Sequence, residues 1–243
     1  MLVIKMLAFR KVSPNMSNKI QPEDALKAID QVLVVDLRNK DIDLTEWHSS
    51  IADIMLVDAA PIEVKQLFEN AKNVALYTYF AYRLHQSAEA IGYTALEKAL
   101  KLKYELEKEN ILIGKSPKTL EDYMNVALNQ GWIKSERYNS LRHLASSRVQ
   151  QKRFIELIKS GTLRNQEPTP IPDAEEHEII AEMRDMDIAE RVLHAGRRVR
   201  NFLAHGDGGL SPSAIGTLEK IAEEINQLYS SAPSLGGSQN STS

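Results

Sequence analysis

Three arginines, an amide and an imidazole lie close together near residue 200 of this 243-residue chain. They are Arg197, Arg198, Arg200, Asn201 and His205. Guanidinium groups bind the charged oxygens of a phosphate ester, and a histidine exchanges its proton near neutral pH. This run is therefore the first candidate for a catalytic or anion-binding site.

The segment that must position these groups is predicted to be a helix over residues 181–203. Its apolar residues are spaced by three and four, and the glycine-rich stretch 206–209 ends the pattern. At about 100° per residue, Arg198, Asn201 and His205 share one helical face, whereas Arg200 reaches His205 only if the helix end unwinds. The alternative is an ordinary helix end with solvated arginines and a histidine that caps carbonyl groups.

The sequence Arg200-Asn201-x-x-x-His205 resembles the signature of the HEPN family, in which an arginine, often followed by a polar residue, precedes a histidine after a short spacer. Arg198 also fits the spacing, but Arg200 alone is followed by an asparagine. The ending Ala204-His205-Gly206 is also typical of the family. The resemblance extends over residues 61–229.

The resemblance implies an all-α, antiparallel helical bundle that forms a homodimer and cleaves RNA without a metal ion or cofactor. In such a reaction the RNA 2′-OH attacks the neighbouring phosphate. His205 would then be the base, or the acid through its dimer mate. Arg200, or Arg198, would stabilise the charge that develops on the phosphate, and Asn201 would orient His205 or the phosphate.

Two further contributions follow from the same resemblance. Arg197 and Arg198 would contact the RNA substrate. Glu97, on the second long helix, would face the motif as a further catalytic residue. The alternative for Glu97 is a surface carboxylate paired with Lys101 four residues later.

An endoribonuclease of this kind would act as a toxin or as an effector of antiviral (phage) defence, with an antitoxin or regulatory protein as a possible partner. Asp207 stands where family members with nucleotidyltransferase antitoxins carry a tyrosine, which argues against regulation by modification of that position. The second hypothesis is a non-catalytic, dimerising HEPN-like module that binds RNA, a nucleotide or a protein. A third is an unrelated helical interaction protein.

Composition sets the remaining limits. The net charge is −3, so RNA binding requires local basic patches; one candidate is the segment 134–164, and its alternative is a solvated charged surface. The chain has no cysteine, which excludes disulfides and thiolate chemistry. No apolar run approaches the ~20 residues that span a bilayer, so we expect a cytoplasmic protein with no membrane partner.

The helical domain is expected over residues 61–229, with an insertion around 149–190 and a disordered tail over 230–243. The N-terminal segment 1–60 is ambiguous. Pro22, Glu23 and Asp24 form a helix-start signal, yet residues 31–37 also have a strand-like composition, and we favour helix.

Overall fold

The computed structural model describes residue 20 and residues 24–111, 116–160, 172–193, 196 and 213–230. Within these ranges the regular secondary structure is entirely helical, which confirms the all-α prediction for this part of the chain. The α-helices are α1 (Leu44–Ala52), α2 (Ile62–Tyr77), α3 (Leu84–Glu107), α4 (Leu120–Asn129), α5 (Arg142–Lys159), α6 (Glu176–Asp185) and α8 (Ala214–Tyr229). Short 3-10 helices are η2 (Ile29–Gln31), η3 (Leu37–Asn39), η4 (Lys108–Asn110), η5 (Ser135–Arg137) and η6 (Asn139–Leu141). None of the described helices is long and apolar enough to cross a membrane.

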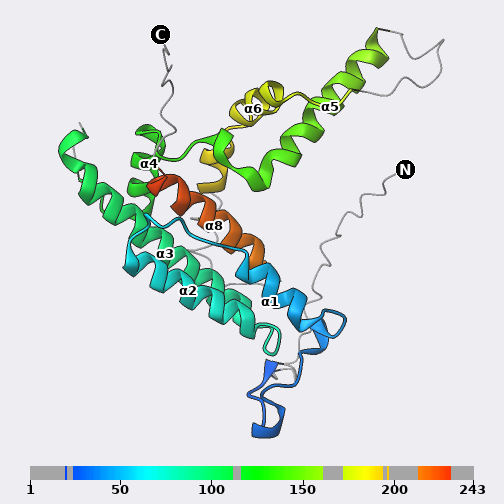
Figure 1. Ribbon diagram of the computed structural model, residues 1–243, viewed down its shortest axis with the longest axis vertical. Helices are drawn as coiled ribbons and strands as arrows, with labels where there is room; N and C mark the ends of the chain where they lie inside the picture. Colours follow the sequence, from blue (N-terminus) through cyan, green and yellow to red (C-terminus); the bar gives the residue numbers. More distant parts are fainter. Residues whose placement is uncertain are drawn as a thin grey trace, which may run out of the picture.

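The helices α2, α3 and α8 lie side by side and form the central bundle (Figure 1). A short turn at 78–83 joins α2 to α3, so these two helices are antiparallel. In contrast, α8 runs in the same direction as α3, because Thr217 bonds to Glu89 near the start of both helices and Tyr229 bonds to Ala99 further along both. The predicted antiparallel arrangement is correct for α2 and α3 and wrong for α3 and α8. The long connection between α3 and α8 removes the constraint that a short turn imposes.

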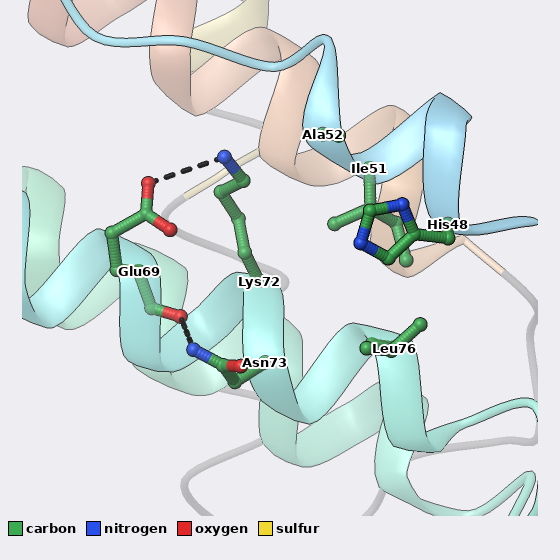
Figure 2. Close-up of a pocket in the computed structure, with 7 residues that line it drawn as sticks. All are labelled: His48, Ile51, Ala52, Glu69, Lys72, Asn73 and Leu76. Atoms are coloured by element: carbon green, nitrogen blue, oxygen red, sulfur yellow. Dashed lines mark hydrogen bonds and ion pairs between the residues drawn. The ribbon is translucent and has the colours of Figure 1, made fainter.

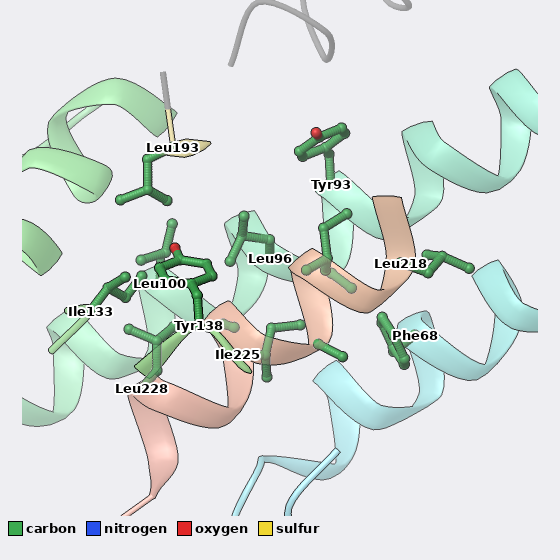
Figure 3. Packing of buried hydrophobic residues seen from close by; sticks show 14 of the residues in the cluster. Phe68, Tyr93, Leu96, Leu100, Ile133, Tyr138, Leu193, Leu218, Ile225 and Leu228 are labelled. Carbon is green, nitrogen blue, oxygen red and sulfur yellow. The ribbon is translucent and has the colours of Figure 1, made fainter. Parts of the chain in front are cut away.

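Small residues on α3 allow α8 to approach it closely. Ala88 and Ala95 are fully buried, and a Cβ atom added to Gly92 would lie 2.7 Å from Leu218 Cδ2. Around this contact the bundle buries large apolar side chains, and burying one such side chain contributes about 1.5–3 kcal/mol. Figure 3 shows several of them, including Phe68, Leu96, Leu100, Leu218 and Ile225.

The described part of the N-terminal segment contains the short turns η2 and η3 and no α-helix before α1, so the favoured helix over 24–37 is wrong. Ion pairs determine its path instead: the Asp24 carboxylate accepts bonds from both Arg38 and Arg83, at 3.1 and 2.6 Å. Burial raises the pKa of Asp36, but hydrogen bonds from Arg38 and the Tyr82 N–H outweigh it and lower the pKa to about 2. The apolar side chains that suggested a helix, such as Leu26, are exposed and have no core to pack against.

The helices α5 and α6 pack on each other and project from the bundle as an arm (Figure 1). The structure corrects one boundary here. The helix before the motif was expected from residue 181, but α6 begins at Glu176 and ends at Asp185. The helix is interrupted at Asp187, whose φ of 47° lies in the left-handed region. Upstream, Thr119 caps α4, because its side chain forms a capping box with Asp122.

Candidate functional site

The predicted site residues fall into two groups. Five of them lie outside the described residues: Arg197, Arg198, Arg200, Asn201 and His205. Glu97 is described, on α3, where Lys101 Nζ lies 2.6 Å from its Oε1 atom. This is the pairing expected of a surface carboxylate, although Glu97 also has a further interaction. The proximity of Glu97 to the motif stays a prediction.

The chain that leads into the motif is held against α3. Residues 188–193 are helical, and Leu193 is 1% exposed within the core. Gly196 is packed so tightly on α3 that an added Cβ atom would lie 2.9 Å from Tyr93 Cε1. Because real Cβ atoms do not approach carbon so closely, this position requires glycine. Arg197 therefore follows directly after a residue in contact with α3.

The chain that leaves the motif returns to the same helix. The Ser213 hydroxyl and the Thr217 hydroxyl both donate to Glu89 Oε1 on α3, the latter at 3.0 Å. Glu89 and Tyr93 are four residues apart on one face of α3, and Glu97 is four residues further along. The residues on both sides of the segment 197–212 thus contact one face of α3, at Tyr93 and Glu89, which lie four and eight positions before Glu97.

A cavity of about 220 Å³ lies beside these anchoring points, between α3, α8, the helical residues 188–193 and Gly196. Its lining combines apolar side chains with groups that bear charge: Tyr93, Arg191, Val192, Gly196, Thr217, Lys220, Ile221 and Glu224. Arg191 and Lys220 are exposed, and neither forms an ion pair with a carboxylate of the described residues. Among the described residues, the cavity therefore has two rim cations without an ion-pair partner.

Glu224 is a buried carboxyl group in the wall of this cavity. Burial raises its pKa to about 8, and the neighbouring Glu223 charge acts in the same direction. The Tyr138 hydroxyl and the Lys220 charge both act to lower the pKa of Glu224, but burial outweighs them. Among the described residues, neither Glu224 Oε2 nor the buried Tyr138 hydroxyl has a hydrogen-bond partner of good geometry. Near neutral pH this carboxyl group carries a proton for much of the time, so it can donate as well as accept a hydrogen bond.

A second recess lies between α1 and α2 and is also lined by polar side chains, but these are less suited to binding a ligand (Figure 2). Lys72 donates to Glu69 at 3.1 Å, and the Asn73 side-chain amide donates to the Glu69 backbone carbonyl at 2.8 Å. These donors are already used within α2. With His48 alone facing them from α1, no convergent set of free donors is formed.

The basic segment 134–164 was a candidate for contacts to the RNA backbone. In the structure four of its seven described cations pair with acids of α6: Arg142 with Glu176, Arg153 with Glu178, and Arg148 and Lys152 with Glu182. For these four, the expected alternative of a charged surface describes the segment better.

Within the described part of the chain, no group of three or more histidine, aspartate or glutamate side chains is arranged to hold a metal ion. Comparison with protein-family models, with curated proteins and with solved structures finds no match to this chain.

Sequence reasoning missed Glu224 and the contact between Gly196 and Tyr93. A signal for Glu224 was present: it lies three residues after Ile221, inside the apolar row of the last helix. An acid in such a row is either buried or at its edge. The packing role of Gly196 had no comparable signal, because it depends on a residue more than 100 positions earlier.

Proposed function

We propose that the protein is a metal-independent endoribonuclease of the HEPN type, with its site on the segment 197–205. The main support for this proposal is that the residues on both sides of that segment are in contact with α3. Gly196 contacts Tyr93 before it and Ser213 bonds to Glu89 after it. A segment whose flanking residues are both held on one helix face can present cations to a phosphate in a preorganised way, as electrostatic catalysis needs.

The reaction needs no nucleophile from the protein, because the RNA 2′-OH attacks the adjacent phosphorus and the 5′-oxygen leaves. His205 removes the 2′-OH proton as the base, or the second His205 of the homodimer protonates the leaving 5′-oxygen as the acid. Arg200 or Arg198 stabilises the negative charge on the phosphoryl oxygens, and Asn201 orients the reacting groups. Glu97 holds a motif arginine or histidine in place. A toxin or defence role, with a protein partner, is part of this proposal.

The direct test incubates purified protein with cellular RNA in excess EDTA. We expect wild type to cut and His205→Ala to lose cutting by about 10²-fold or more, as expected for loss of a general base. His177→Ala, which alters an exposed histidine on α6, is the matched control and should cut like wild type. Cleavage by folded His205→Ala at the wild-type rate would overturn the assignment.

Two matched pairs refine the roles. Comparing Arg200→Ala with Arg198→Ala identifies the functional arginine, since the catalytic one should lower kcat and the other should raise KM. Glu97→Gln should lower kcat, whereas Glu105→Gln, at a more exposed carboxylate of the same helix, should not. If Glu97→Gln is also neutral, Glu97 is only the surface partner of Lys101.

One observation favours a second function, a module that binds without cutting. Four arm cations, Arg142, Arg148, Lys152 and Arg153, are paired with acids of α6, so they are not available to bind a long RNA. A non-catalytic protein would show RNA or nucleotide binding in the same assay conditions with no cleavage in EDTA or with added divalent ions.

A further inference from the structure

In the cavity between α3, α8, residues 188–193 and Gly196, the apolar lining residues are buried or half-buried, whereas the lining cations are exposed. Tyr93, Val192 and Ile221 supply apolar surface, while Arg191 and Lys220 are exposed to solvent. At about 220 Å³ it is smaller than the ~300–1,000 Å³ that encloses a drug-sized ligand. Only part of a ligand therefore enters, and the remainder must lie at the cationic rim.

The polar groups define the chemistry of each part. The exposed guanidinium and ammonium groups of Arg191 and Lys220 suit a phosphate, since neither is neutralised by a carboxylate of the described residues. Inside, the buried Glu224 carboxyl group lines the wall and is 3% exposed. A carboxyl group in an apolar cavity selects a flat ligand edge with hydrogen-bonding groups of its own, such as the edge of a nucleobase.

We propose that this cavity binds one nucleotide unit, with its base inside against Tyr93 and Glu224 and its phosphate at Arg191 and Lys220. The source of that unit is RNA, and this part of the assignment rests on the proposed function. Arg197 follows Gly196, a lining residue of the cavity, so a nucleotide held here belongs to the same strand as the phosphate at the motif. The cavity is then a base subsite that positions RNA for cleavage.

The test measures binding separately from cleavage. The full chain carrying His205→Ala is titrated with a labelled 2′-O-methyl RNA oligonucleotide, and the four nucleoside 5′-monophosphates and inorganic phosphate are used as competitors. We expect the double change Arg191→Ala with Lys220→Ala to weaken oligonucleotide binding about tenfold, because two phosphate-binding cations are lost. Lys159→Ala removes an exposed lysine at the end of α5 and should change binding less than about twofold.

Glu224→Gln tests the interior. It should weaken competition by at least one nucleoside monophosphate and leave competition by inorganic phosphate unchanged. Circular dichroism and thermal unfolding check that each variant is folded. Should Glu224→Gln unfold the protein, Val192→Phe provides a second test, since it places a ring at the half-buried edge of the cavity and should exclude the base.

Each outcome has a separate meaning. Unchanged oligonucleotide binding by the rim variant overturns the proposal, and so does competition by inorganic phosphate as strong as that by every nucleoside monophosphate. If nucleoside monophosphates bind in the cavity but these variants leave oligonucleotide binding unchanged, the ligand is a free nucleotide and the assignment of an RNA subsite is wrong. If the variants behave as expected but wild type never cuts RNA, the proposed function fails and the nucleotide site stands.

Discussion

The central bundle and the projecting arm are both helical, but different forces hold them. In the bundle, α3 contacts α2 and α8 through buried alanines, Gly92 and large apolar side chains. In the arm, α5 and α6 are joined by ion pairs as well as by the buried Ala145 and Met183, and apolar side chains further along α5, such as Phe154 and Ile158, stay 45% and 54% exposed. A cluster of cations in the sequence therefore shows that a segment lies at the surface, but not that it binds an anionic ligand. In this protein four arm cations bind acids of the next helix, whereas Arg191 and Lys220, which have no ion-pair partner among the described residues, border the bundle cavity.

The largest effect should come from removing a core side chain of the bundle. Leu96 is fully buried on α3, so Leu96→Ala should lower the free energy of unfolding by about 3–4 kcal/mol through lost burial and a residual cavity. Urea unfolding at neutral pH measures this. Leu106→Ala, at a 71% exposed position of the same helix, is the control and should cost less than about 0.5 kcal/mol. Equal effects of the two changes would contradict the packing described here.

The next effect concerns pH. The folded-state pKa of Glu224, about 8, lies above its unfolded value. The stability that the protonated Glu224 carboxyl group contributes to the folded state is thus fully present below pH ~4.3 and is lost as pH rises through 8. Wild type should lose stability relative to Glu224→Gln between these limits, by at most about 1.4 kcal/mol per pH unit.

Urea unfolding of both proteins from pH 5 to 9 tests this expectation. Glu219→Gln, an exposed position on α8, should leave the wild-type slope unchanged. Parallel curves for wild type and Glu224→Gln would show that Glu224 is ionised throughout and that its surroundings are more polar than described.

The smallest effect should come from the arm. The Glu182 side chain is 4% exposed and faces Arg148 and Lys152, which are about half-exposed. Glu182→Gln should cost about 1–2 kcal/mol, because the released cations remain hydrated. Hydrogen exchange should then rise in α5 and α6 and stay unchanged in α2, α3 and α8, and salt should reduce the difference between variant and wild type. Equal protection loss in the bundle would show that the two regions unfold together.

Periodic apolar rows made much of the bundle predictable from sequence. Apolar residues at helical spacing over residues 62–108 and from Ile215 to Leu228 predict long helices, and α2, α3 and α8 lie in these ranges, since burial of one face determines such helices. The same approach gave a wrong helix in the N-terminal segment, because the path of that segment depends on the pairing of Asp24 with Arg38 and Arg83, which are distant in sequence. The direction of α8 was likewise not predictable, as a long connection permits either direction.

For the candidate site, the sequence indicated the motif and Glu97 but neither the cavity nor its buried acid. Glu97 was proposed from the family resemblance, and its role stays a prediction. The cavity is assembled from three separate stretches of chain, and no local pattern reports such a contact. The motif residues 197–205 lie outside the described residues, so their roles are tested by experiment on the reaction itself.

The most direct measurement uses an RNA oligonucleotide that wild type cuts at one mapped position in excess EDTA. The same oligonucleotide is then prepared with a single 2′-deoxy sugar on the 5′ side of that position. Attack by the RNA 2′-OH predicts a 2′,3′-cyclic phosphate on the product of the all-ribose RNA and no cleavage at the substituted position. Cleavage of the 2′-deoxy substrate at the wild-type rate would contradict the mechanism, because the nucleophile would then come from elsewhere.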